Sequence, residues 1–204
     1  MKPYVEIARV LAKKDVVLSK VIASVKKEIK PSPVTDVYYS LLESIVSQQL
    51  SIKVADVIWK RLTDLFADQY PHAKQIIAFE DEVLRSVGLS GQKTKYINNV
   101  ALFSLQNNLS FDYINSLSDV EIIDYLTQIK GIGKWTVQMI LMFTMDRPDV
   151  FPVDDFGIQS KMKYWYNLNL ENKELKNKLI EISENWQPYR TLACKYLWQS
   201  EIKK

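Results

Sequence analysis

Apolar residues recur three and four positions apart along most of the chain, the spacing that places side chains on one face of an α-helix. The first such stripe consists of Leu18, Val21, Ile22, Val25 and Ile29. Further stripes run through 41–46, 54–66 and 122–129, and few segments alternate apolar with polar residues. With only five glycines in the chain, this pattern predicts an all-α protein whose helices follow one another closely.

Prolines and capping residues mark where these helices begin and end. Pro31 and Pro33 interrupt the chain after the N-terminal helices, because proline cannot continue a helix. The sequence SDVE, Ser118–Glu121, matches a capping box and predicts a helix start. Pro148 and Pro152 bracket a short extended link. Since no internal repeat or long linker separates these parts, we expect one body that can divide into two helical lobes.

Composition excludes several classes of protein. The 204 residues contain one cysteine, Cys194, and one histidine, His72, too few for a disulfide framework, a four-cysteine iron–sulfur cluster or a cysteine-based zinc ribbon. The first residues resemble no targeting peptide, and no apolar stretch is long enough to cross a bilayer. We therefore predict an intracellular protein, cytoplasmic at the nucleoid if its source is bacterial. A net charge of +3 permits a nucleic-acid partner without indicating one.

The segment Leu126–Phe143, LTQIKGIGKWTVQMILMF, places a glycine-containing turn between two helices. Gly131 and Gly133 let the backbone adopt positive φ and approach a partner closely, and the next helix start presents N–H groups that can bind a phosphate. Lys130 and Lys134 flank the turn, and we expect Ile132 to anchor it on the core. An ordinary αα-hairpin has the same pattern, so the turn alone does not decide between the two interpretations.

Two consecutive carboxylates follow this hairpin. The segment Arg147–Gln159, RPDVFPVDDFGIQ, brings Asp154 and Asp155 to the start of another helix. An aspartate there is commonly only a helix N-cap. With two of them, we predict that Asp154 caps the helix and that Asp155 projects into the cleft that the hairpin faces.

Together, KGIGKWT (Lys130–Thr136) and VFPVDD (Val150–Asp155) closely resemble the helix–hairpin–helix DNA glycosylase superfamily, in which a Gly-x-Gly hairpin precedes an essential aspartate. The segments 44–62, 84–101 with its GLS-x-x-K-x-x-Y element, and 186–198 also resemble that superfamily. The resemblance covers about residues 38–200 and is strongest to the alkylbase branch, 3-methyladenine DNA glycosylase II.

The resemblance implies a fold and a domain organisation. It predicts two helical lobes, with the DNA-binding hairpin and the active site in the cleft between them. Residues 1–36 would form N-terminal helices that pack with the C-terminal lobe, 37–149 a lobe with the helix–hairpin–helix at about 118–145, and 150–204 the C-terminal lobe. The expected partner is double-stranded DNA with damaged bases. We expect no membrane association, a monomer and no required cofactor.

The resemblance also implies a reaction, the excision of alkylated purines such as 3-methyladenine and 7-methylguanine by base flipping and hydrolysis with catalytic Asp155. Bifunctional members carry a lysine two positions after the second hairpin glycine. Here that residue is Trp135, which predicts a monofunctional enzyme, because Lys134 lies about 100° away around the helix. The alternatives are a bifunctional glycosylase/lyase, a non-catalytic DNA-binding hairpin module in which Asp155 is only a cap, and a helical interaction protein without nucleic acid.

The same resemblance assigns further residues. The base pocket would be formed by Trp135 and Trp198, with Tyr189 as a third candidate, although tryptophans are commonly core residues. Gln49 and Leu50 match the wedge that fills the gap left by a flipped base. The predicted contacts to the DNA backbone are Lys130, Gly131, Ile132, Gly133, Lys134, Thr136, Lys53 and Lys93. The carbonyls of Thr127, Ile129 and Ile132 match a site for a monovalent cation.

Overall fold

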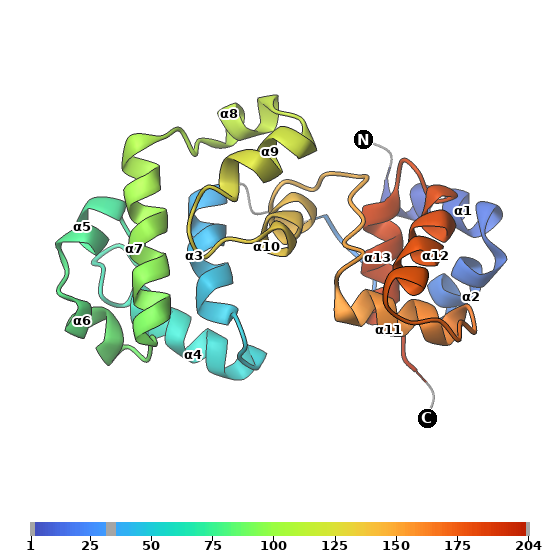
Figure 1. Cartoon of the computed structure of the whole chain (residues 1–204), viewed down its shortest axis with the longest axis horizontal. Coiled ribbons are helices and arrows are strands. Elements are labelled where there is room, and N and C mark those ends of the chain that lie inside the picture. The colour runs from blue at the N-terminus through green and yellow to red at the C-terminus, as the bar shows by residue number, and fades with distance from the viewer. Residues whose placement is uncertain (1–2, 32–35, 203–204) are drawn as a thin grey trace. The chain divides into compact units, whose positions relative to one another are not determined.

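The computed structural model describes residues 3–31 and 36–202, and all regular elements within these ranges are helical (Figure 1). The predicted all-α class is confirmed. None of the helices in the described part of the chain is long and apolar enough to span a membrane.

The chain divides into two compact units. Unit 1 comprises Met1–Pro33 and Leu141–Lys204, and unit 2 comprises Val34–Ile140. The resemblance to the superfamily placed a lobe boundary at 149/150. The division instead falls at 140/141, where α10 (Lys134–Met139) continues into the π-helical segment η1 (Ile140–Thr144).

Unit 1 is assembled around α13 (Arg190–Gln199). This helix packs against α1 (Tyr4–Lys14), α2 (Val16–Ser24) and α11 (Phe156–Trp165), and α12 (Asn172–Glu184) packs against α11 (Figure 1). Six of the ten residues of α13 are buried, so the helix is covered on most of its surface, as expected for the central helix of a core.

Unit 2 is assembled around α7 (Gly91–Gln106), which packs against α3 (Val37–Ser47), α5 (Ala73–Ala78) and α6 (Asp81–Ser86) (Figure 1). The remaining helices of this unit are α4 (Ile52–Thr63), α8 (Phe111–Ser116), α9 (Asp119–Leu126) and α10. The predicted capping box is present, since the Ser118 and Glu121 side chains each accept a hydrogen bond from the other residue's backbone N–H. One unit thus contains the predicted wedge residues Gln49 and Leu50, the glycine-containing turn of 131–133 and α7.

The first apolar stripe is not a single helix. The helix α2 ends at Ser24, and Val25 has an extended conformation. Ile29 is nevertheless buried at 7% exposure. Helical spacing therefore identified a buried residue that lies in irregular chain, and Pro31 shortly after it limits how far any helix can continue.

Candidate functional site

The two glycines of the hairpin turn between α9 (Asp119–Leu126) and α10 differ in conformation and surroundings. Gly131 has φ +108°, and a Cβ there would lie 2.3 Å from Cγ of Tyr96. Gly133 is the N-cap residue of α10 with φ −99°, and a Cβ there would have no neighbour within 4 Å. Gly131 is therefore required by the turn itself, whereas Gly133 leaves open space where a partner can approach the backbone.

The other hairpin residues are only partly where the sequence placed them. Lys130 and Lys134 are exposed, and Ile132 is buried at 4% exposure, as predicted for the residue that anchors the turn. Thr136 is also buried, at 5% exposure. Its helical position after Gly133 turns it toward the core of the unit, so this predicted DNA contact does not lie on the surface.

The wedge loop, which we define as residues 48–51, joins α3 to α4. Gln49 is exposed and has φ 58°, a left-handed conformation, and Leu50 is 37% exposed. Gln48 is the first residue of this loop and the C-cap of α3. Its Nε2 donates a hydrogen bond to the carbonyl of Gly131 at 3.2 Å. This bond connects the wedge loop directly to the hairpin turn.

The two lysines predicted to contact DNA near this loop differ in their surroundings. Lys53 is exposed in the first turn of α4. Lys93 is partly buried, and its Nζ donates to the carbonyls of Val46 at 2.7 Å and Gln48 at 2.8 Å. Burial lowers the pKa of Lys93. The sequence predicted that the Lys93 ammonium binds a DNA phosphate. In the structure it instead binds protein carbonyls at the start of the wedge loop.

In unit 1, the extended link before Asp155 is attached to the start of α13. The guanidinium of Arg190 donates to both carboxylate oxygens of Asp149, each at 2.8 Å. The hydroxyl of Thr191 donates to the carbonyl of Arg147 at 2.6 Å and accepts from the N–H of Val150 at 3.0 Å. These bonds fix the backbone that leads to the two aspartates.

The predicted capping role of Asp154 is wrong, because the structure gives that role to Asp155. Asp155 is the N-cap of α11, and its Oδ1 accepts from the N–H of Ile158 at 2.8 Å. Asp154 is exposed and pairs with Lys176, with 2.6 Å between Oδ1 and Nζ. Capping requires only one carboxylate oxygen, so the cap function does not by itself exclude a second function for Asp155.

The same oxygen of Asp155 accepts a hydrogen bond from the far end of the chain. Nε1 of Trp198, on α13, donates to Oδ1 at 2.9 Å. A Cβ on Gly157 would lie 3.0 Å from Oδ1 and 3.2 Å from Nε1 of Trp198. Glycine at position 157 therefore leaves the space in which the carboxylate and the indole meet.

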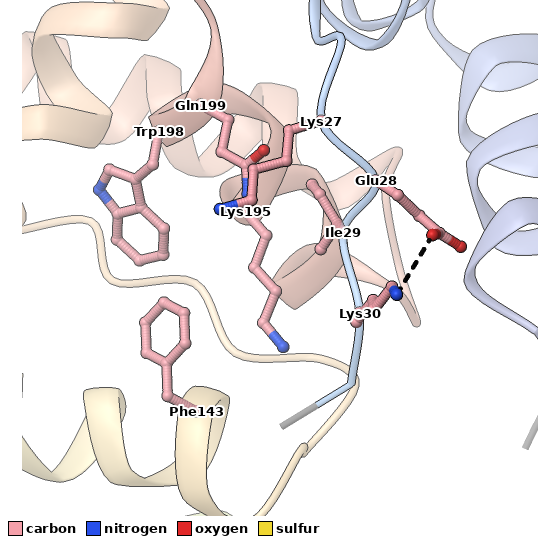
Figure 2. Close-up of a pocket in the computed structure, with 8 residues that line it drawn as sticks. All are labelled: Lys27, Glu28, Ile29, Lys30, Phe143, Lys195, Trp198 and Gln199. Atoms are coloured by element: carbon pink, nitrogen blue, oxygen red, sulfur yellow. Dashed lines mark ion pairs between the residues drawn. The ribbon is translucent and has the colours of Figure 1, made fainter. Parts of the chain in front are cut away.

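Trp198 also lines a cavity of about 740 Å³ in unit 1. Figure 2 shows the Trp198 and Phe143 rings beside each other, with a centroid distance of 5.5 Å and an interplanar angle of 35°. The cavity is lined by Lys27, Glu28, Ile29, Lys30, Phe143, Lys195, Trp198 and Gln199. Sequence reasoning missed Phe143, since an aromatic residue near the end of an apolar helix resembles any core residue.

A partly buried ion pair lies next to Phe143. Lys195 is 5% exposed, and its Nζ lies 3.1 Å from Oδ1 of Asp146 and 5.4 Å from the centroid of the Phe143 ring. The hydroxyl of Tyr4 donates to the same carboxylate. These contacts link α1, α13 and the chain that follows η1, and they support the Phe143 side of the cavity.

The three predicted base-pocket residues occupy different places. Trp135 is 45% exposed in unit 2, whereas Trp198 and Tyr189 belong to unit 1. Tyr189 precedes α13 and lines a separate small cavity with Tyr4 and Pro148. Tyr189 and Trp198 thus line different cavities, although they are only nine positions apart in the sequence.

Three kinds of group that were considered from the sequence can be located in the structure: metal-ligating side chains, the Cys194 thiol and the carbonyls predicted to bind a cation. Within 3–31 and 36–202, no group of three or more histidine, cysteine, aspartate or glutamate side chains could hold a metal ion. Cys194 is buried, and burial, followed by the charge of Asp155, raises the pKa of its thiol. A protonated, buried thiol is a poor nucleophile. Among the three carbonyls predicted to bind a cation, that of Ile129 accepts the N–H of Ile132 at 2.9 Å.

Comparison with protein families gives a match over most of the chain. The model of the HhH-GPD superfamily of base excision DNA repair proteins matches residues 42–188. DNA-3-methyladenine glycosylase 1 of Schizosaccharomyces pombe is 34% identical over 80% of this chain and 72% of its own length. Two Bacillus subtilis relatives match 80% and 81% of the chain, which spans only 58% and 57% of their lengths.

Solved structures show the same similarity. The S. pombe 3-methyladenine DNA glycosylase Mag1, in complex with abasic DNA, has a TM-score of 0.84 and 29% identity, with 95% of each chain covered. A DNA-3-methyladenine glycosidase from Bacillus halodurans has a TM-score of 0.81 and 34% identity, with 97% of this chain and 88% of that chain covered.

Proposed function

Because the chain belongs to the HhH-GPD superfamily of base excision DNA repair proteins, we propose that it is a monofunctional DNA N-glycosylase. It releases alkylated purines of the 3-methyladenine and 7-methylguanine type from double-stranded DNA. The observation that carries this proposal is the Asp155 carboxylate, held by the N–H groups of Ile158 and Trp198 beside an aromatic cavity. The relatives named for 3-methyladenine support the substrate class.

The proposed reaction breaks the bond between C1′ of the sugar and the nitrogen of the damaged base, and the bond electrons leave with the base. Positive charge builds on the sugar as this bond breaks. The carboxylate of Asp155 stabilises that charge and also has the chemistry to orient or deprotonate the attacking water. Water supplies the hydroxyl that remains on C1′, and the product is an abasic site in an intact strand.

Aromatic rings suit the proposed substrates. A purine alkylated at N3 or N7 carries a positive charge before its bond is broken, and such a cation is attracted to the face of an aromatic ring. Trp198 and Phe143 supply two adjacent rings within unit 1. We assign the recognition of the base to these two residues, and we assign no contact with the base to Tyr189. Trp135 is half-exposed in unit 2, and its predicted contact with the base stays a separate prediction.

The proposed grip on DNA comes from unit 2. Gln49 and Leu50 are exposed at the wedge loop and would fill the gap left by the everted base. Three lysines are exposed and would approach DNA phosphates: Lys53, Lys130 and Lys134. The open space at Gly133 leaves room for the sugar–phosphate backbone of the DNA. Such contacts predict DNA binding that weakens steeply as salt rises.

Trp135 supports hydrolysis without strand cleavage, because an indole cannot form the Schiff base that a lysine forms at this position in bifunctional members. Borohydride reduction of a reacting mixture tests this point. The proposal requires that no covalent protein–DNA adduct be trapped, and an adduct that disappears in a Lys134→Met variant would establish the lyase alternative.

We further propose that the carbonyls of Thr127, Ile129 and Ile132 hold a monovalent cation that bridges to a phosphate. The support is their position in the hairpin turn beside Gly133. Replacement of potassium by choline at constant ionic strength should weaken binding to duplex DNA. Equal affinity in the two salts would contradict the cation site.

The experiment that tests the function compares the wild type with Asp155→Asn on duplex DNA treated with a methylating agent, with the released bases resolved by chromatography. Asparagine keeps a helix cap as good as aspartate, so this variant removes the charge and leaves α11 capped. Asp154→Asn is the matched control, since it removes the neighbouring charge. The proposal requires release by the wild type and by Asp154→Asn, with little release by Asp155→Asn.

Two results would contradict the proposal. Absence of released bases from wild-type protein that binds DNA would favour a non-catalytic hairpin module. Equal release by Asp155→Asn and the wild type would leave Asp155 as only a helix cap.

A further inference from the structure

We propose that Lys93 is a positioning residue that holds the wedge loop against the hairpin, so that eversion of the base and anchoring of the backbone act as one step. This proposal rests on the proposed function and adds a residue that acts through the loop without touching the substrate. The lysine belongs to the GLS-x-x-K-x-x-Y element of 88–96, which the proposed reaction leaves without a role.

The ammonium of Lys93 acts as a clamp at the end of α3. Its two acceptors, the carbonyls of Val46 and Gln48, belong to the last turn of that helix and to the first residue of the wedge loop. Carbonyls at a helix C-terminus lack partners within the helix and carry partial negative charge, so a cation there is favourable. One side chain from α7 thus fixes the point where the loop leaves α3.

The same helix also holds the hairpin. Lys93, Tyr96 and Asn99 are spaced by three residues and lie on neighbouring turns of α7. Gly131 packs directly on the ring of Tyr96, and Nδ2 of Asn99 donates to the carbonyl of Lys130 at 3.0 Å. One face of α7 therefore sets the position of the wedge loop at one end and the hairpin turn at the other.

A direct bond joins the two attached elements. The Gln48 side chain donates to the carbonyl of Gly131, and the Gln48 carbonyl accepts from Lys93. Residue 48 therefore bonds both to the hairpin and to α7. Displacement of the loop away from the hairpin requires all of these bonds to break together.

The clamp matters because the wedge has an unfavourable backbone conformation. Gln49 is left-handed at φ 58°, a conformation that costs a residue other than glycine about 1 kcal/mol or more. Gln49 is exposed, so the surrounding contacts must hold it in this conformation. Bonds to the residue before it, from α7 and to the hairpin, supply that constraint.

The test uses the full-length protein and duplex DNA that carries 2-aminopurine beside an abasic-site analogue, whose fluorescence rises when the stack is opened. The variants are Lys93→Met, which keeps the aliphatic stem, and Gln48→Ala, which removes only the bridge to Gly131. Lys74→Met, from the exposed surface of α5, is the control for loss of one positive charge. Circular dichroism establishes that each variant is folded.

We expect the fluorescence change at saturating protein to fall by at least half for Lys93→Met and Gln48→Ala and to stay unchanged for Lys74→Met. The salt dependence of binding should remain that of the Lys74→Met control. A normal fluorescence change in both test variants would overturn the proposal, as would a log–log salt slope reduced by about one in Lys93→Met alone, the mark of a lost phosphate contact. If Lys93→Met does not fold, Gln48→Ala decides.

These outcomes are separate from those of the proposed function. Fluorescence reports opening of the stack in DNA from which no base is released, so the clamp is tested even if the wild type excises no alkylated purine. Where excision is observed, Lys93→Met should lose about tenfold in rate at a paired lesion and much less at an unpaired one, because eversion of an unpaired base costs less.

Discussion

In unit 1 the proposed catalytic carboxylate is held by a side chain together with a helix N-terminus, whereas in unit 2 the proposed DNA-binding elements are held through their backbone carbonyls. In unit 1 one oxygen of Asp155 accepts two N–H groups, so its geometry depends on the identity of residue 198. In unit 2 Lys93, Gln48 and Asn99 all donate to main-chain oxygens. The bonds in unit 1 orient the Asp155 carboxylate, whereas those in unit 2 fix the backbone path of the wedge loop and the hairpin turn. We therefore expect substitutions to separate catalysis from DNA binding.

The largest effect is expected for a variant of Lys195 in unit 1, which tests whether the two units unfold independently. Replacement of the buried Lys195 by methionine removes the cation beside the partly buried Asp146 carboxylate, and should lower the free energy of unfolding of unit 1 by about 3 kcal/mol. Hydrogen exchange in urea should show lost protection in 190–199 and little change in 91–106. Equal loss in both segments would mean that the units unfold as one, and would remove the basis of the comparison.

A pair of glycine variants sharpens the description of unit 2. Gly131→Ala places a methyl group against Tyr96 at positive φ and should lower the free energy of unfolding by about 2 kcal/mol. Gly133→Ala has open space in the free protein, so it should leave thermal stability unchanged and weaken duplex binding by about tenfold. Calorimetry and fluorescence anisotropy measure these two quantities. If Gly133→Ala binds duplex DNA as tightly as the wild type, the DNA backbone does not approach this turn closely.

In unit 1, Trp198→Phe removes the N–H that reaches Asp155 and keeps an aromatic ring beside Phe143. Base release should slow by about tenfold, since a hydrogen bond to a charged group contributes about 1.5 kcal/mol. The affinity for DNA should not change. Trp165→Phe is the matched control, because its indole bonds to Ser200 in the same unit. Equal rates for the two variants would show that the bond to Asp155 has no catalytic role.

The smallest effect concerns Cys194. Burial raises the pKa of its thiol, so the reactive thiolate is depleted at pH 8 and appears only as the pH rises toward that raised value. Native protein should therefore resist alkylation by iodoacetamide at pH 8 and react once it is unfolded in urea, as mass spectrometry can show. Rapid alkylation of the native protein would reveal opening of unit 1 around α13.

Local rules predicted the features that depend on neighbouring residues. The capping box at Ser118, the anchoring role of Ile132 and the special backbone at Gly131 all follow from short-range geometry. The family and the helical class were also accessible, because the hairpin and aspartate motifs are short and specific.

Features that depend on distant residues were not predictable in the same way. Asp155 and Trp198 are 43 positions apart, and Lys93 lies 45 from Gln48. Nothing local to Lys93 distinguishes a phosphate-binding lysine from one that binds a helix end. The caps were misassigned because either of two adjacent aspartates satisfies the same rule, and only the tertiary position of Lys176 decides which one forms an ion pair.

The discontinuity of unit 1 has a consequence for synthesis on the ribosome. Unit 2 is one continuous stretch, so every residue of its core exists once position 140 has been translated. In unit 1 the helices α1 and α2 cannot complete their packing at that point, because they pack on α13, which follows unit 2 in the chain. A nascent chain therefore contains all the residues that we propose bind DNA before it contains Trp198, the hydrogen-bond donor to Asp155. Exposed α1 and α2 would be the natural targets of chaperones during that interval.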